Sequence, residues 1–178
     1  MSIDIPAGRY AIDPVHSFLQ FATRFVGARV RGRFSGLSGT LEIAEDLAKS
    51  SVQAQIDVAT LSTGVGERDD HLRSADYFDA ASHPVATFAS NGLVADGDRF
   101  LLAGDLTIRG TIRPVELEVR FTGDGEDQTG TFRMGFTASG RVSRSAFGVN
   151  GNVSKVGGPL LIGDATDITL ELQATRES

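Results

Sequence analysis

The stretch "RVRGRFSG", residues 29–36, decides the fold class, because arginine or serine alternates along it with apolar or small residues. Successive residues of a β-strand point to opposite faces, so this pattern predicts a strand with one apolar face and one face in water. Two glycines lie inside the stretch and Gly39 follows them, and glycines within a strand mark bends or bulges. The sequence therefore predicts one long, curved strand over residues 29–43.

The same period of two recurs in "SVQAQIDVA" (51–59), "VELEVRF" (115–121) and "DITLELQ" (167–173). Short Gly/Asp connections such as "ADGDR" at 95–99 favour antiparallel hairpins. Strands with one apolar face form a barrel or a sandwich, and the glycine-rich second strand and the many inward-facing phenylalanines favour a barrel. We expect an all-β, eight-stranded antiparallel barrel with strands near 16–26, 29–43, 51–61, 85–94, 99–109, 114–122, 130–143 and 166–175.

Length and composition restrict the domain organisation and the classes of partner. The chain has 178 residues, enough for one domain, which we place at residues 1–178. A formal net charge of −6 and the lack of a dense basic cluster argue against a nucleic-acid partner. The sequence has no long apolar window, no signal-peptide pattern and no cysteine. We therefore expect a cytoplasmic protein without stable membrane insertion.

Two segments interrupt the strand pattern, residues 63–83 and the Gly-rich connection 143–165. The first contains "ERDDHLRSADYF" (67–78), whose early acids favour a helix N-terminus, and we predict a short helix across one barrel mouth. His71 has no partner at the His-x-x-x-His spacing and the chain has no cysteine, so no metal site is predicted. No Gly-x-Ser-x-Gly motif marks a hydrolytic centre.

Six blocks of the sequence resemble the YceI-like family, in the order in which that family has them. The resemblance implies a lipocalin-like β-barrel that binds a polyisoprenoid, either a polyprenyl phosphate or an isoprenoid quinone, and it implies neither an enzyme nor a cofactor. The chain departs from the family at Ala146, where an acid often follows the Arg-Ser pair. The blocks are "YAIDPVHSFLQF" (10–21), "RGRFSGLSGTLEI" (31–43), "RDDHLRSADYFDAASHPVATF" (68–88), "GDLTIRGTIRPVEL" (104–117), "RSAFG" (144–148) and "GDATDITLEL" (163–172).

A long apolar ligand agrees with the energetics of burial. Each buried CH2 group contributes about 0.8 kcal/mol, so a five-carbon isoprene unit contributes roughly 4 kcal/mol. Association costs an estimated 4 to 15 kcal/mol, so several units are needed for stable binding. We expect the tunnel to be lined by Phe34, Phe88, Phe132, Met134, Phe136 and Phe147.

The polar head has three candidate partners in the segment that covers the mouth. Arg68, His71 or Arg73 would donate a hydrogen bond to a phosphate or quinone oxygen. In the alternative interpretation, Arg68 pairs with an aspartate and pins the helix to the rim. Two other functions stay open: an enzyme that acts on a small hydrophobic or lipid substrate near His71, and a structural or stress protein with a filled barrel. A homodimer is a further expectation.

Arg29, Arg31 and Arg33 form a basic stripe on the outward face of the second strand. We expect these side chains to lie in water and to pair with Glu42 or Asp57. Contact with an anionic membrane surface is the alternative.

Overall fold

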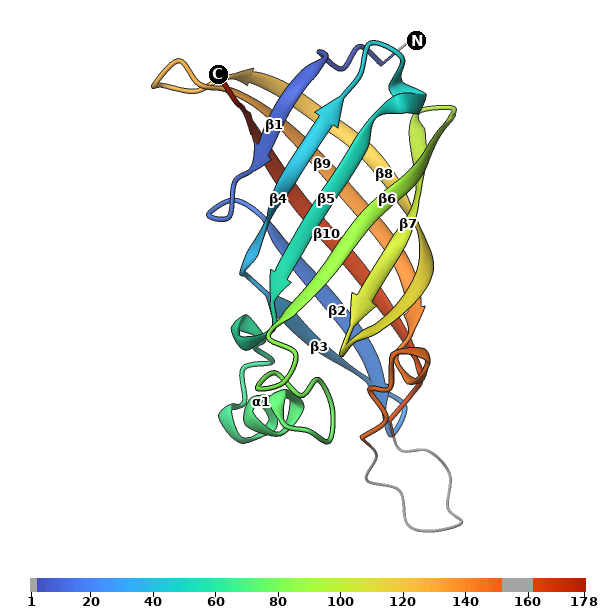
Figure 1. The fold of residues 1–178 in the computed structure, drawn as a ribbon. Coiled ribbons are helices and arrows are strands. Elements are labelled where there is room, and N and C mark those ends of the chain that lie inside the picture. Colours follow the sequence, from blue (N-terminus) through green and yellow to red (C-terminus); the bar gives the residue numbers. More distant parts are fainter. Residues whose placement is uncertain (1–2, 152–161) are drawn as a thin grey trace.

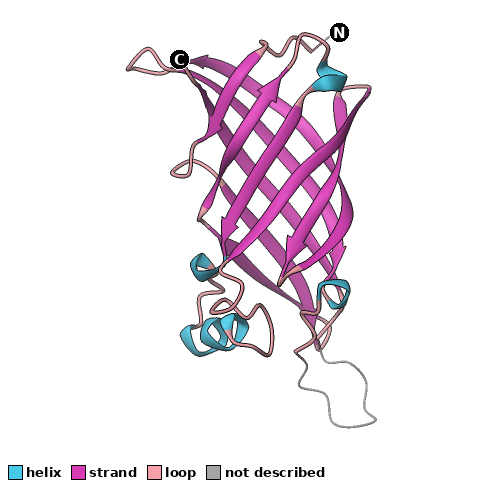
Figure 2. Cartoon of the chain, in the orientation of Figure 1, coloured by secondary structure: helices cyan, strands magenta, loops and turns pink. Residues whose placement is uncertain are grey.

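A computed structural model describes residues 3–151 and 162–178, which form a closed antiparallel barrel (Figure 1). Short helices lie at both ends of the barrel (Figure 2). The strands are β1 (Gly8–Ile12), β2 (Phe18–Phe25), β3 (Ala28–Phe34), β4 (Leu37–Ile43), β5 (Ser51–Asp57), β6 (Val85–Asp96), β7 (Arg99–Ile108), β8 (Thr111–Glu126), β9 (Phe132–Ser143) and β10 (Ala165–Arg176). The helices are η1 (Leu47–Lys49), η2 (Val58–Thr60), α1 (Gly66–Arg73) and η3 (Ser145–Phe147).

The barrel has eight strand positions, because two of them are each filled by two short strands. β10 pairs with β1 through Ile12 and Ala174, and with β2 through Leu19 and Leu170. In the same way β1 pairs with β4, and β2 pairs with β3. The pairs β1/β2 and β3/β4 thus occupy one position each, next to β5 through β10. The predicted eight-stranded, all-β barrel with a short helix at one mouth is confirmed.

The predicted second strand is divided at Ser35 and Gly36, where the chain bends between β3 and β4. The Gly36 N–H donates to Thr60 Oγ1 at 3.0 Å, and its carbonyl accepts from the Asp57 N–H at 2.8 Å. A Cβ atom at Gly36 would lie 2.8 Å from both Asp57 Cβ and Thr60 Cγ2. The bend therefore requires glycine because β3 passes directly against the turn that follows β5.

The end of the barrel that carries the chain termini, here called the upper end, is filled by apolar side chains. Tyr10 and Met134 are essentially inaccessible to water, and the Tyr10 hydroxyl donates to the Pro6 carbonyl at 2.9 Å. The segment before β1 crosses this end, with Ile5 inside the same apolar cluster (Figure 1). At the opposite, lower end, α1 and η2 lie on one side and η3 on the other. The two ends therefore differ: the upper end has an apolar cluster and η1, and the lower end has α1, η2 and η3.

Asp13 joins the turn after β1 to β9. Its carboxylate accepts from Arg133 Nη1 at 2.6 Å and from the Val15 N–H at 2.9 Å, and it lies 2.7 Å from His16 Nδ1. Burial raises the pKa of Asp13, but the hydrogen bonds from Arg133, His16 and Val15 outweigh burial and lower this pKa to about 2. Arg133 also donates to Asp127 at 2.7 Å, which ties the β8–β9 turn to the same network.

We expect acid to remove the stabilisation that Asp13 provides. The pKa of Asp13 is about 2 in the folded protein and about 3.9 in an unfolded chain, so the contribution is complete above pH 4 and is lost as the pH falls through about 2. It amounts to about 2 kcal/mol. Urea unfolding between pH 6 and pH 2 should show that Asp13→Asn lacks this part of the pH dependence. Equal pH dependence in both proteins would contradict the assignment.

Candidate ligand-binding cavity

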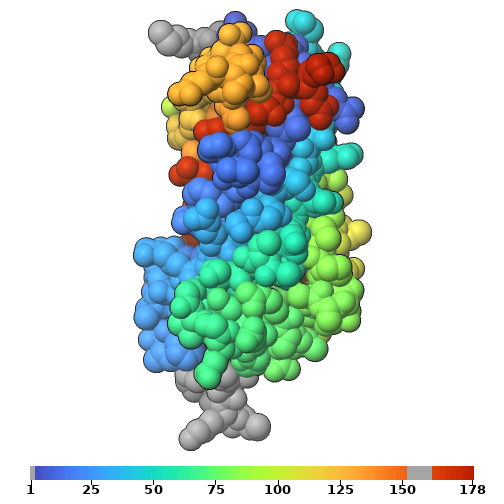
Figure 3. All heavy atoms as spheres, turned by 90° about the vertical axis from the view of Figure 1, so that its left-hand side faces the viewer, coloured from blue at the N-terminus to red at the C-terminus, as the bar shows by residue number. Residues whose placement is uncertain are grey.

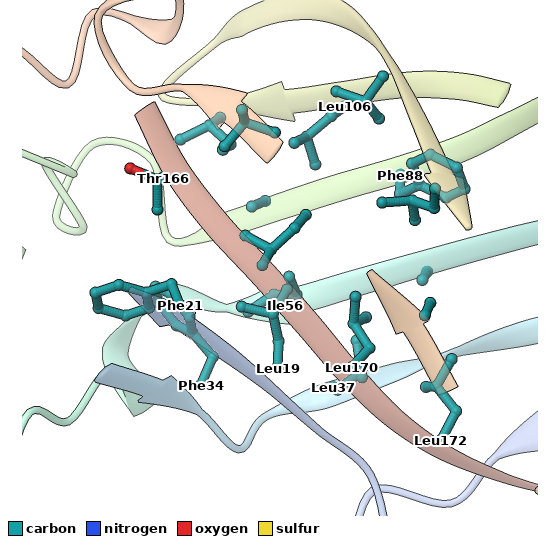
Figure 4. Close-up of a pocket in the computed structure, with 18 of the residues that line it drawn as sticks. Leu19, Phe21, Phe34, Leu37, Ile56, Phe88, Leu106, Thr166, Leu170 and Leu172 are labelled. Carbon is teal, nitrogen blue, oxygen red and sulfur yellow. The ribbon is translucent and has the colours of Figure 1, made fainter. Parts of the chain in front are cut away.

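The barrel encloses a cavity with a volume of about 430 Å³. This volume lies within the range of roughly 300–1,000 Å³ that is usual for ligand pockets. The inward-facing side chains of β2 to β10 supply an almost wholly apolar wall, and Thr166 contributes a hydroxyl near one end (Figure 4). A barrel filled by its own side chains, one of the alternatives from the sequence, does not describe this structure.

Aromatic rings gather at the lower part of the cavity. Phe34 lies with its ring centroid 5.6 Å from that of Phe21 and 5.6 Å from that of Phe78, the second in an edge-to-face arrangement. Phe21 lies directly over Gly32 on the neighbouring strand, where a Cβ atom would fall 2.1 Å from the ring. Figure 4 shows Phe21 and Phe34 side by side. Gly32 therefore leaves the space that this aromatic group needs.

The structure separates the six predicted tunnel residues into two groups. Phe34, Phe88, Phe136 and Phe147 line the cavity. Phe132 and Met134 do not line it, which corrects the expectation from the sequence. Both lie in the apolar cluster of the upper end, where the Phe132 ring centroid is 6.3 Å from that of Tyr10. The alternating pattern of β9 predicts correctly that both side chains point into the barrel. At the upper end, however, inward side chains pack against one another and do not border the cavity.

The lower mouth of the cavity is basic. Arg68 and His71, two of the three predicted head-group residues, are among the lining residues. Two further arginines, Arg24 and Arg144, also line the cavity, and the sequence analysis did not identify them. No aspartate or glutamate from residues 3–151 and 162–178 belongs to the lining. A bound head group would therefore meet positive charge, although the whole chain has a net charge of −6.

Arg73, the third predicted head-group residue, points away from the cavity. Its guanidinium donates to the Leu61 carbonyl at 2.6 Å and to the Ala59 carbonyl at 3.2 Å, and it pairs with Asp70 at 3.1 Å. These contacts attach the C-terminal turn of α1 to the segment that follows β5. Arg73 is thus a residue that fixes the helix to the rim, and it is absent from the cavity lining.

The N-terminal turn of α1 is fixed through Thr63. The buried carboxylate of Asp69 accepts from the Thr63 N–H at 2.8 Å and from Thr63 Oγ1 at 2.5 Å. Burial raises the pKa of Asp69, but these hydrogen bonds and the charges of Arg73 and Arg68 outweigh it, so the pKa lies below its usual value. Arg68 donates to the same hydroxyl at 2.7 Å. Among the described residues Arg68 does not form the direct pair with an aspartate that the alternative interpretation expected; Arg68 and Asp69 each bond to Thr63 instead.

Arg144 organises the chain on the other side of the mouth. Its guanidinium donates to four backbone carbonyls, those of Val149 at 2.7 Å, Gly163 at 2.8 Å, Gly151 at 3.1 Å and Ile162 at 3.1 Å. Within the described residues Arg144 makes no salt bridge, but its charge acts on the nearby Asp164 and helps to lower the pKa of that carboxyl group. Of the predicted connection 143–165, residues 152–161 lie outside the described residues.

His71 is held in a fixed orientation at the rim. Its Nε2 lies 2.9 Å from Asp76 Oδ2, and its ring packs edge-to-face on Tyr77 with centroids 5.1 Å apart. The hydroxyl of Ser74 donates to the His71 backbone carbonyl at 2.6 Å and not to the ring. In the described part of the chain the ring therefore has a carboxylate partner, and no hydrogen bond joins it to the Ser74 hydroxyl. Across the described part of the chain, no three His, Asp or Glu side chains gather in a metal-binding group.

The basic stripe faces water, as expected, but its partner differs from the prediction. Arg29 pairs with Asp167 on β10 at 3.0 Å. Glu42 instead pairs with Arg9 at 3.3 Å, and Asp57 accepts from the Ala59 N–H at 3.1 Å. Asp167 is within reach of Arg29 because β10 lies beside β2 in the closed barrel, on the side away from β3.

None of the helices in the described residues has the length and apolar character needed to span a bilayer.

Comparison with known proteins gives consistent matches over nearly the whole chain. The model of the YceI-like domain matches residues 10–174. A UPF0312 protein of Photorhabdus laumondii is 33% identical over 175 residues, covering 96% of this chain and 88% of its own. Protein YceI of Escherichia coli O157:H7 is 37% identical over 147 residues, covering 80% and 77%.

Two solved structures resemble the barrel. BcnA of Burkholderia cenocepacia superimposes with a TM-score of 0.80 at 26% identity, over 92% of this chain and 99% of its own. A polyisoprenoid binding domain from Saccharophagus degradans, implicated in plant cell wall breakdown, gives a TM-score of 0.69 at 19% identity, over 97% and 100%.

Proposed function

Because this chain belongs to the YceI-like family, we propose that its barrel binds, stores or carries one isoprenoid lipid. The isoprenoid chain would occupy the apolar cavity and the polar head would lie at the lower mouth. The observation that carries the proposal is the cavity of about 430 Å³, lined by apolar side chains along the barrel and by basic groups at one end. The polyisoprenoid binding domain from Saccharophagus degradans, which shares the fold, supports the same ligand class.

The energetics of such a cavity favour a long hydrocarbon. Its wall offers few hydrogen-bonding groups along the barrel, so a polar ligand would lose hydrogen bonds to water without replacing them. A hydrocarbon gains about 0.8 kcal/mol for each CH2 group removed from water. Affinity would therefore increase with the number of isoprene units, up to the number that the cavity accommodates.

We further propose that the head is anionic, as in a polyprenyl phosphate, and not a quinone. Arg24, Arg68, His71 and Arg144 border the mouth, and no acid among the described residues lines the cavity itself, although Asp76 lies beside His71 at the rim. Guanidinium groups match the oxygens of a phosphate with paired, charge-assisted hydrogen bonds. A neutral quinone would not use the charges of Arg24, Arg68 and Arg144 in this way. The acidic net charge of the whole chain has little effect at the mouth, because salt screens the interaction between a head group and distant charges.

The direct test is mass spectrometry of the organic extract of protein purified from its own cells without detergent. A stoichiometric isoprenoid would support the proposal and would identify the head at the same time. If the extract is empty, and added prenyl phosphate neither co-purifies with the protein nor raises its melting temperature, the proposal fails.

We predict that Arg68→Gln lowers the affinity for a long-chain prenyl phosphate by about tenfold. The guanidinium would be lost from the mouth, and one charge-assisted hydrogen bond is worth about 1.5–3 kcal/mol. The affinity for the corresponding neutral prenyl alcohol should not change, and fluorescence titration can measure both. The matched control is Arg113→Gln, because Arg113 is exposed and its side chain bonds, among residues 3–151 and 162–178, only to the Ile112 carbonyl. An equal loss for phosphate and alcohol would contradict head-group recognition by Arg68.

We propose binding without catalysis. The ring of His71 faces Asp76, and the hydroxyl of Ser74 is engaged by a backbone carbonyl. We therefore expect His71→Ala to weaken binding modestly and the wild-type protein to convert no substrate. If the wild type does convert a lipid substrate, and His71→Ala abolishes that turnover while binding stays intact, the enzyme alternative is favoured. A single domain over residues 1–178, a cytoplasmic location and a homodimer stay predictions from the sequence.

A further inference from the structure

The β2–β3 hairpin concentrates positive charge. Between Asp13 and Glu42 the sequence contains four arginines and no acid, although the whole chain has a net charge of −6. The hairpin register places Arg24 directly opposite Arg29. Arg29, Arg31 and Arg33 are exposed on β3, and Arg29 reaches across β2 to pair with Asp167 on β10. The hairpin is therefore a local basic surface on an acidic protein.

The tip of the same hairpin is apolar and exposed. Val26 is 66% exposed and Phe25 is 41% exposed. Phe25 also lines the cavity, so the exposed tip continues directly into the cavity mouth. In Figure 3 this segment, in blue, protrudes beside the green segment that contains α1. Val65, at the start of α1 on the same end of the barrel, is another exposed apolar residue.

The backbone at the tip is unfavourable for the residue that occupies it. Val26 and Gly27 form a two-residue turn with φ angles of 47° and 81°, and Phe25 pairs with Ala28 across it. Such turns prefer Asn-Gly, because positive φ is tolerated by asparagine and is strained for a β-branched residue. At position 26 the fold thus has an exposed apolar side chain in a strained conformation, where a polar residue would fit better. Strain of this kind often marks a functional site.

We propose that the tip of the β2–β3 hairpin docks on the surface of an anionic lipid bilayer, so that the isoprenoid passes between bilayer and cavity. The transfer step rests on the proposed function, whereas the docking does not. Val26 and Phe25 would enter the interfacial region, and the hairpin arginines would meet the anionic head groups. The upper end is less suited to such a surface, because its turns and adjoining strand ends carry Glu45, Asp46, Asp96, Asp98, Asp124, Glu126 and Asp127, four of which pair with basic residues there.

Val26→Asn separates docking from folding, because the two effects have opposite signs. It should raise the melting temperature by about 2–4 °C, since asparagine suits the turn. It should lower the affinity for vesicles of phosphatidylglycerol and phosphatidylcholine by about tenfold, since an apolar contact is lost. Arg31→Gln should lower the same affinity roughly fivefold, an effect that high salt removes. Co-sedimentation with vesicles that contain no isoprenoid measures both losses.

The matched control is Val94→Asn, because Val94 is 62% exposed next to the β6–β7 turn at the opposite end. It should leave vesicle binding unchanged. The proposal is overturned if wild-type protein binds neutral phosphatidylcholine vesicles as well as anionic ones, or if Val26→Asn binds like wild type. Because the vesicles lack isoprenoid, vesicle binding tests the docking proposal alone. Isoprenoid binding in solution tests the proposed function alone, so either proposal can be contradicted while the other is supported.

Discussion

Ala86→Phe is expected to abolish isoprenoid binding while it raises the stability of the fold. Ala86 is the second residue of β6, is buried and lines the cavity close to the lower mouth. A phenyl ring there would stand between the mouth and the inner cavity and would displace at least one isoprene unit. That loss is worth roughly 4 kcal/mol, so the affinity should fall by more than about a hundredfold.

The same ring would occupy empty apolar space, and the free energy of unfolding should rise by about 1 kcal/mol. Fluorescence titration with a long-chain prenyl phosphate and urea unfolding give the two readings. The matched control is Ala89→Phe, three residues along β6 on the outward face, which is exposed. It should leave the affinity as in wild type. Tight binding by the Ala86 variant would place the ligand outside the barrel.

Arg144→Ala is expected to destabilise the lower end of the barrel more than any other single arginine substitution considered in this protein. Four backbone carbonyls would lose their donor at once. Hydrogen bonds from a charged group contribute about 1.5–3 kcal/mol each, and water can reach part of this exposed end. We expect the free energy of unfolding to fall by about 3 kcal/mol.

Arg144→Lys should recover little of this loss, because a single ammonium group lacks the planar fork that reaches several carbonyls at once. Arg141→Ala is the control, since Arg141 is exposed and, within the residues that the structure describes, pairs only with Asp167. Its effect should stay below about 1 kcal/mol, as for most surface ion pairs. Urea unfolding measures all three variants. A loss of similar size for Arg141 and Arg144 would show that the carbonyl contacts do not hold this part of the fold.

The strands of this protein could be predicted because the alternation of apolar and polar residues lies within each strand and does not depend on the rest of the fold. Alternation in "RVRGRFSG" and its counterparts marks the inward face, and the count of eight strands follows from it. The break at Gly36 could not be predicted, since it depends on contact with Thr60 and Asp57 after the barrel closes. Alternation also predicts correctly that Phe132 and Met134 point into the barrel. It does not predict how far along the barrel axis they lie, and at the upper end they pack near Tyr10 and do not line the cavity.

The mouth was predicted in part for a related reason. Arg68 and His71 belong to a segment that already interrupted the strand pattern. Arg24 is the last residue but one of a regular strand, so nothing in its sequence context marks it as a mouth residue. The role of Arg144 depends on carbonyls from both ends of a long connection, which meet only in the folded protein. Arg73 sits in the same helix as Arg68 and His71, yet its guanidinium reaches back to the chain after β5. Sequence proximity within the helix does not reveal which side chains turn toward the cavity.

The upper end of the barrel is packed around Tyr10 and Met134, yet Ile5, Leu47 and Ser50 at that end still line the cavity. The apolar wall therefore runs along most of the barrel, and its length would act as a gauge for the proposed ligand. Every carbon beyond that length would stay in water without gaining its share of about 0.8 kcal/mol. The barrel would accept short chains and long chains alike but would cease to reward extra length at one value.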